Sequence, residues 1–168
     1  MKEDILTGIL LGVVISMGTQ ILTFLGLGLS NNFVLLTYVC VFIFILVAQR
    51  KHWHKTKDKI PFCKALLTVI VIIIISRYIF QTYMYIYVTF INTNWIQEVS
   101  EYWTQLLQES NTPQEAIGRQ IQNFKRAYLP ARMFTIEILR YGFSQIVLGF
   151  MASLYFIFRK PHHKNIHA

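Results

Sequence analysis

Four long apolar blocks constrain the fold of this chain more than any other feature of its sequence. They cover about residues 5–29, 33–48, 62–91 and 133–158. A helix rises about 1.5 Å per residue, so about 20 apolar residues cross the roughly 30 Å hydrocarbon core of a bilayer. The second block is short, but the Lys and Arg side chains that follow it can extend to the lipid headgroups. We therefore expect an integral membrane protein with four transmembrane helices.

Composition supports this class of protein. Hydrophobic residues make up 54% and charged residues 14% of the 168-residue chain, whereas soluble domains have about 45–50% and about 25%. The first block exceeds the ~7–15 residues of a secretory-signal core, so we expect a retained helix. The length predicts a single domain, 1–168.

Basic residues predict the orientation of the helices. The N-terminus, the connector at 49–64 and the tail 159–168 hold ten Lys and Arg together, and the turn at 30–32 holds none. The polar segment between the third and fourth blocks holds four basic residues and four glutamates. Because cytoplasmic loops carry an excess of Lys and Arg, we expect both termini and a basic connector (49–61) in the cytoplasm.

The segment 92–131 predicts two amphipathic helices in an extracytoplasmic hairpin. Apolar residues recur at helical spacing in each half: Trp95, Val99, Trp103 and Leu106, then Ile117, Ile121, Phe124 and Tyr128. Asn94 is expected to cap the first helix, and Thr112 with Glu115 is expected to form a capping box for the second. The fold class is therefore all-α: a four-helix membrane bundle with a two-helix hairpin between spans three and four.

Polar residues inside the apolar blocks are the candidate site. Arg77 and Gln81 share one face of the third block, and Glu137, Arg140 and Ser144 share one face of the fourth. On the first block, small and polar residues recur at intervals of four and begin with a GxxxG pattern that allows close helix approach: Gly8, Gly12, Ser16 and Gln20.

The expected depths of these residues overlap in the outer half of the bilayer, at roughly 7–20 Å from the outer helix ends at ~1.5 Å per residue. The sequence therefore predicts one polar cluster: Gln20, Arg77, Gln81, Glu137 and Arg140. Three interpretations stay open for it: a structural staple that fixes helix register, an outward-facing site for an anionic group, and a proton relay through Glu137.

Other chemistry has little support in the sequence. There is no phosphate-binding glycine loop, GxSxG or HExxH motif, and Cys40 and Cys63 have no metal-ligand spacing, so we expect no enzyme, cofactor or metal site. The histidines His52, His54, His162, His163 and His167 are expected to be solvated and near lipid headgroups. The basic stretches lack interleaved aromatics, so we expect no nucleic acid as a partner.

The order of these parts resembles the bacterial domain-of-unknown-function family 4199, small four-span inner-membrane proteins. The most specific piece is "FCKAL", residues 62–66, where Cys63 stands at a position that is more often glycine in the family. The hairpin "NTNWIQEV…TPQEAIGRQIQNF" and the basic end of the last block also correspond. The resemblance implies the four-span topology and no established activity.

Taken together, we expect a non-enzymatic membrane module that binds a lipid, an anionic ligand or a protein partner on its outer side. Anionic phospholipid is the expected lipid partner. The alternative is a small transporter or transporter subunit with an intramembrane Arg/Glu site. Gly142, Gly149 and Ser153 indicate a second buried face on the last block, which also allows a homo-oligomer.

Overall fold

The apolar blocks form long helices. The computed structural model describes residues 1–25, 31–56 and 60–158, and over these residues it is all-helical, with no strand. Ser30, in the expected turn, and the expected tail 159–168 lie outside the described residues. The elements are α1 (Lys2–Phe24), α2 (Asn31–Lys55), α3 (Phe62–Ile86), the π-helical η1 (Tyr87–Ile91), α4 (Trp95–Glu109), α5 (Gln114–Ala127), the short α6 (Pro130–Arg132), the π-helical η2 (Met133–Glu137) and α7 (Ile138–Phe158).

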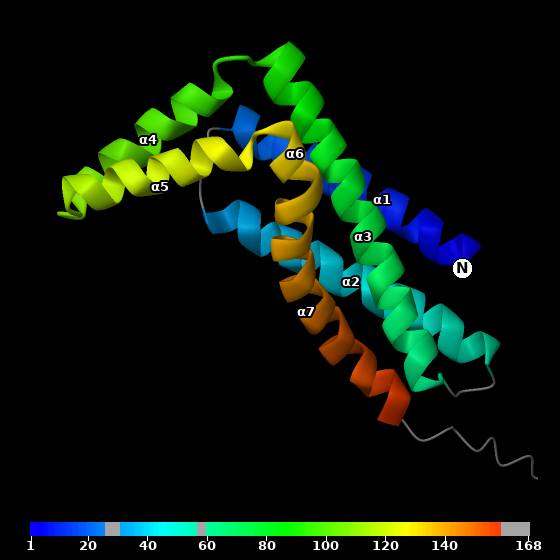
Figure 1. The fold of residues 1–168 in the computed structure, drawn as a ribbon. Coiled ribbons are helices and arrows are strands. Elements are labelled where there is room, and N and C mark those ends of the chain that lie inside the picture. The colour runs from blue at the N-terminus through cyan, green and yellow to red at the C-terminus, as the bar shows by residue number, and fades with distance from the viewer. Residues whose placement is uncertain (26–30, 57–59, 159–168) are drawn as a thin grey trace, which may run out of the picture.

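Four helical stretches in the described part of the chain are long and apolar enough to cross a membrane. They are Lys2–Phe24, Val34–Lys55, Phe62–Ile91 and Pro130–Phe158. Helix α1 packs chiefly on α3, and α7 packs on both α3 and α2. Figure 1 shows α4 and α5 side by side, projecting from the end of the bundle at which α3 finishes and α6 leads into α7. We call this end the cap end, and the opposite end, where α1 begins and α7 finishes, the terminal end.

Small residues let α1 lie against α3. A Cβ atom added at Gly8 would lie 3.0 Å from the backbone oxygen of Ile72, and one at Gly12 would lie 2.9 Å from that of Ser76. Because a backbone oxygen cannot move aside like a side chain, both positions require glycine at this helix separation. The expected close approach through the GxxxG pattern is confirmed.

The small-residue face of α7 is buried inside the chain. A Cβ atom at Gly149 would overlap Ile45 of α2 and lie 2.9 Å from Val69 of α3. Ser153 is fully buried and accepts a 2.9 Å hydrogen bond from the side-chain amide of Gln49. This face therefore joins α7 to α2 and α3 within one molecule.

Charged contacts join α1 and α2 at the terminal end. The expected connector 49–61 is helical through Lys55, because polar groups after the apolar run have buried partners. His52 Nε2 lies 2.6 Å from Asp4 Oδ1, and both residues are buried. Lys55 forms an ion pair with Glu3 nearby. The expectation of a solvated His52 is wrong, since the acidic start of α1 supplies a carboxylate for it.

Helices α4 and α5 pack through the apolar faces that the sequence indicated. Val99 and Ile117 are both 2% exposed, and the rings of Trp95 and Phe124 lie 6.3 Å apart. Asn94 occupies the N-cap position of α4 as expected, although its side chain makes no capping hydrogen bond. The expected capping box of α5 is wrong, because Pro113 rather than Thr112 occupies the N-cap position and no side chain caps the helix. Packing between the two faces, rather than the caps, holds this pair together.

Replacing Gly12 with alanine should destabilise the protein. The new methyl group would overlap Ile79 and the Ser76 carbonyl, and overpacking of this kind costs about 1–3 kcal/mol. Gly118→Ala is the matched control, because its added Cβ meets no atom within 4 Å. Thermal melting of the two purified variants should show a lowered Tm for Gly12→Ala alone, and equal melting curves would contradict this packing.

Candidate functional site

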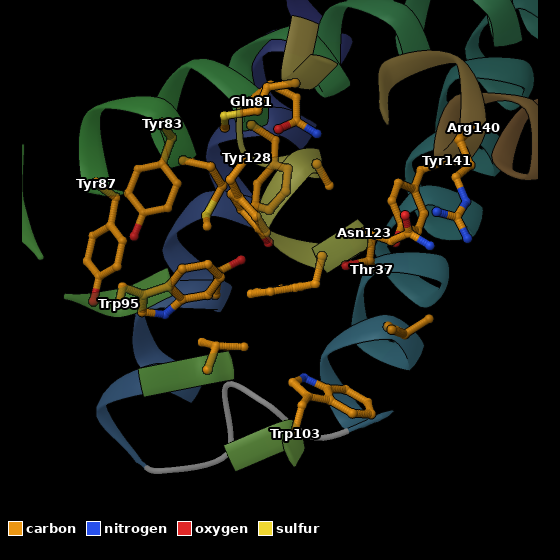
Figure 2. Close-up of a pocket in the computed structure, with 18 of the residues that line it drawn as sticks. Thr37, Gln81, Tyr83, Tyr87, Trp95, Trp103, Asn123, Tyr128, Arg140 and Tyr141 are labelled. Carbon is orange, nitrogen blue, oxygen red and sulfur yellow. The ribbon is translucent and has the colours of Figure 1, made fainter. Parts of the chain in front are cut away.

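A cavity of about 650 Å³ lies at the cap end, between the four long helices and the α4–α5 pair (Figure 2). This volume is within the ~300–1,000 Å³ that usually holds a small-molecule ligand. The lining comes from every long element: Thr19 and Thr23 (α1); Val34, Thr37 and Tyr38 (α2); Arg77, Phe80, Gln81, Tyr83, Met84 and Tyr87 (α3 and η1); Trp95, Val99, Trp103 and Leu107 (α4); Gln120, Ile121, Asn123, Phe124, Ala127 and Tyr128 (α5 and its end); and Met133, Arg140 and Tyr141 (η2 and α7).

Two arginines meet at one side of this cavity. The guanidinium carbon of Arg77 lies 5.5 Å from the ring centre of Tyr141, and that of Arg140 lies 5.7 Å from the same ring. The two charged groups are therefore no more than about 11 Å apart. Such cation–π contacts stabilise a guanidinium without neutralising its charge.

Arg77 is the more buried of the two, at 5% exposed. Its Nε donates a 2.8 Å hydrogen bond to Oε1 of Gln145, which is fully buried on α7. Its guanidinium carbon also lies 6.0 Å from the ring centre of Phe80, one turn farther along α3. A buried charge is costly unless hydrogen bonds satisfy it, so the bond to Gln145 ties α3 to α7 at this level.

Two further groups shape this side of the cavity. The hydroxyl groups of Tyr38 on α2 and Ser144 on α7 lie 2.8 Å apart. The side-chain nitrogen Nε2 of Gln145 is buried and has no hydrogen-bond partner among the described residues. This nitrogen is therefore a buried donor close to Arg77, whose Nε bonds the oxygen of the same amide.

Aromatic rings form the other side of the cavity. Tyr83 and Tyr87 stack at 6.0 Å, Tyr87 lies edge-on to Trp95 at 6.4 Å, and Trp95 lies 5.1 Å from Tyr128. Figure 2 shows Tyr83, Tyr87 and Trp95 at one side, and Arg140, Tyr141, Asn123 and Thr37 at the other. The cavity thus has a charged side and an aromatic side.

The structure brings together three of the five residues of the predicted cluster. Arg77, Gln81 and Arg140 line the cavity. Gln20 does not line it; this residue is exposed and accepts a hydrogen bond from the hydroxyl group of Tyr83, a lining residue. The side chain of Glu137 lies outside the described residues, although its backbone ends η2.

The geometry of the helix explains why Gln20 does not line the cavity. A step of four residues advances a helix by 400°, so each step drifts by about 40° from the starting face. After the three steps from Gly8 to Gln20 the drift reaches about 120°. Gly8, Gly12 and Ser16 stay buried against the bundle, and Gln20 turns to the surface.

Sequence reasoning missed Gln145 and Tyr141. Both are polar groups within the fourth apolar block, and Gln145 follows directly after Ser144, which the helical phase did identify. The signal for Gln145 was therefore present, since an amide within a membrane span needs a partner. Tyr141 lies near both arginines only because α3 approaches α7, and the sequence has no signal for that approach.

The charged side chains that line the cavity are both cationic. Its described lining residues include two arginines and no Asp, Glu, Lys, His or Cys. A guanidinium presents several N–H donors in a fixed fork that fits carboxylate and phosphate groups. No group of three or more His, Cys, Asp or Glu able to hold a metal ion occurs among the described residues.

These features define a class: an all-helical protein with four helices suited to cross a membrane and a cationic cavity at one end. Residues 6–160 match the family DUF4199, whose description is "Protein of unknown function". The match covers nearly the whole chain, so the protein belongs to this family, as the resemblance at "FCKAL" indicated. Comparisons with the curated proteins and with the solved structures found no match.

A double-mutant cycle should measure the coupling of Arg77 to Gln145. Gln145→Leu leaves the guanidinium without its buried acceptor, and Arg77→Leu leaves the buried amide without its donor, so each should cost about 1–3 kcal/mol. The double variant replaces both partners with apolar groups and should recover much of that loss, because no buried polar group is left unpaired.

Thermal melting of the four proteins checks this, with the exposed Gln122→Leu as the control for adding a leucine. Strictly additive losses in the double variant would show that the two side chains are not coupled.

Proposed function

We propose that this chain is a non-enzymatic protein of a bacterial inner membrane that binds an anionic group in the cavity at its cap end. One observation carries the proposal: Arg77 and Arg140 reach the same cavity from different helices, and each guanidinium lies within 6 Å of the centre of the Tyr141 ring. The bound group is a phosphate or a carboxylate, which either a phospholipid or a free solute can supply.

Burial favours this role for Arg77, and Arg140 is the exposed member of the pair. Electrostatic attraction is stronger at a site that excludes water, so an anion beside the 5%-exposed Arg77 gains more than it would at the surface. The bond to Gln145 uses only the Nε donor and holds the side chain in position. Pre-positioned donors of this kind lower the entropy that a ligand loses on binding.

A binding role also fits the other lining side chains. Amides and aromatic hydroxyls surround the charged side, among them Gln81, Gln120 and Asn123. These groups orient a ligand through hydrogen bonds, whereas nucleophilic or acid–base catalysis uses pairs of activated groups. The sequence contains no motif that supplies such a pair, so we propose binding rather than catalysis.

Charge distribution supports placing the cap end outside the cytoplasm. In the sequence, the N-terminus, the connector 49–64 and the tail 159–168 hold ten Lys and Arg, and the segment 92–132 has no net charge from its four basic residues and four glutamates. The positive-inside rule then puts both termini in the cytoplasm and the α4–α5 pair on the outer side. The cavity would open toward the outer face of the membrane.

A small carrier is the second candidate, because both helices that hold the arginines carry a π-helical segment at the cap end. These segments are η1 and η2, and the cavity is lined by Tyr87 from the first and Met133 from the second. Irregular helical turns within spans are common at functional sites and at transporter binding sites. In this function the anion would cross the membrane, with Glu137 available for proton coupling.

Removing either arginine should abolish retention of an anionic ligand. We expect native mass spectrometry of the gently extracted protein to show a bound anionic species that disappears in Arg77→Leu and Arg140→Leu and persists in Arg119→Leu. Arg119 is an exposed arginine on α5 that does not line the cavity. The same spectra report any stable partner or second copy of the chain.

If the arginine variants retain the same anionic species as the unchanged protein, the proposal is wrong. Uptake of the bound species into liposomes that contain the protein would favour the carrier over the binding module.

Cysteine labelling should establish the orientation. In a chain without Cys40 and Cys63, Ser110→Cys at the α4–α5 turn should react with a membrane-impermeant maleimide in intact cells. His54→Cys, an exposed position near the end of α2, should react only after the membrane is broken. The reverse pattern would place the cap end in the cytoplasm.

A further inference from the structure

The two sides of the cavity lie at different levels of the molecule. The charged side is set within the four-helix bundle, because Arg77 is bonded to the fully buried Gln145 of α7. The other side extends under α4 and α5, which Figure 1 shows projecting away from the bundle. One cavity therefore joins a cationic inner end to a region beneath the α4–α5 pair.

Every α4 residue that lines the cavity is apolar or aromatic, whereas α5 contributes Gln120 and Asn123 as well as apolar side chains. Val99, Trp103 and Leu107 follow one another at intervals of four along α4, and all three line the cavity. Ile121 and Phe124 face the same space from α5. Trp103 remains 36% exposed, so its ring is accessible to a ligand.

The order of these two sides is the reverse of a lipid in the outer leaflet. A resident phospholipid would place its headgroup toward the outside and its chains toward the bilayer centre. Here the cations lie deeper and the apolar lining lies farther out, given the orientation above. The volume of about 650 Å³ also suits one small molecule, in the range of ~300–1,000 Å³ for such sites.

We infer that the ligand is a single-chain anionic amphiphile that enters from the outer aqueous side with its charged end first. Its phosphate or carboxylate binds on the side of the cavity that Arg77 and Arg140 line, and its apolar chain lies beneath the α4–α5 pair against Trp103. This inference rests on the proposed function for its charged end and adds the chain, the direction of entry and the source of the ligand.

Alkyl phosphates of increasing length test the inference directly. Inorganic phosphate and butyl, hexyl and octyl phosphate are titrated into the full-length protein in phosphatidylcholine nanodiscs, with empty nanodiscs as the blank. Calorimetry should show affinity that rises by up to about fourfold per added methylene, as burial of each methylene from water predicts. Tryptophan emission should change with binding, because Trp95 and Trp103, two of the three tryptophans, line the cavity.

Two adjacent aromatic residues form a matched pair of variants. Trp103→Ala should weaken octyl phosphate by about tenfold and leave inorganic phosphate unchanged, since only the chain contacts the ring. Tyr102→Ala should change neither, because Tyr102 lies next to it on α4 and does not line the cavity. Arg77→Leu and Arg140→Leu should weaken every phosphate in the series.

The outcomes separate this inference from the proposed function. If all the phosphates bind equally and only the arginine variants lose them, the anion site stands and the amphiphile is wrong. If phosphatidylglycerol in the nanodisc displaces octyl phosphate, a resident lipid occupies the site and entry from the aqueous side is wrong. If neither the phosphates nor octanoate, the matching carboxylate, binds, the proposed function and the inference both fail.

Discussion

Burial of the Arg77 guanidinium within an apolar helix is the constraint on which the architecture of the cap end depends. Arginine keeps its charge in a protein interior, so the surrounding structure must supply acceptors and polarisable neighbours. Gln145 of α7 supplies the acceptor, and the rings of Phe80 and Tyr141 supply the neighbours. This requirement places α7 against α3 in one register. It also leaves a polar space beside the charge, which becomes the cationic side of the cavity.

Side-chain size then decides where the bundle is closed and where it is open. Glycines at positions 8, 12 and 149 bring the helices into near contact along the middle of the bundle. At the cap end the facing residues are large, among them Tyr83, Tyr87 and Trp95. Large side chains keep the helices farther apart there than the glycines do in the middle of the bundle, and the cavity lies between them. The α4–α5 pair covers it with the face that it presents to the bundle, and its own packing needs no side-chain caps.

The predicted polar cluster shows how far helical phase can be trusted. Residues four apart lie on the same face of a helix, so the sequence correctly grouped Arg77 with Gln81, and both line the cavity. Phase over three steps of four accumulates drift, which is why Gln20 lies at the surface. The pairing of His52 with Asp4 joins residues 48 positions apart, and no local pattern contains such information. The sequence shows Gln145 as a polar residue within a span, but it does not show that Arg77 is its partner.

The sequence by itself determined the all-helical class, the number of helices suited to a membrane, the two amphipathic helices and the family. These properties follow from hydrophobic blocks and helical periodicity, which act over short stretches of chain. Only the tertiary structure decided that two arginines share one ring, that Gln145 holds one of them, and that an aromatic side faces a cationic side. Those relations depend on the rotation and separation of whole helices, which are fixed by contacts between residues far apart in the chain.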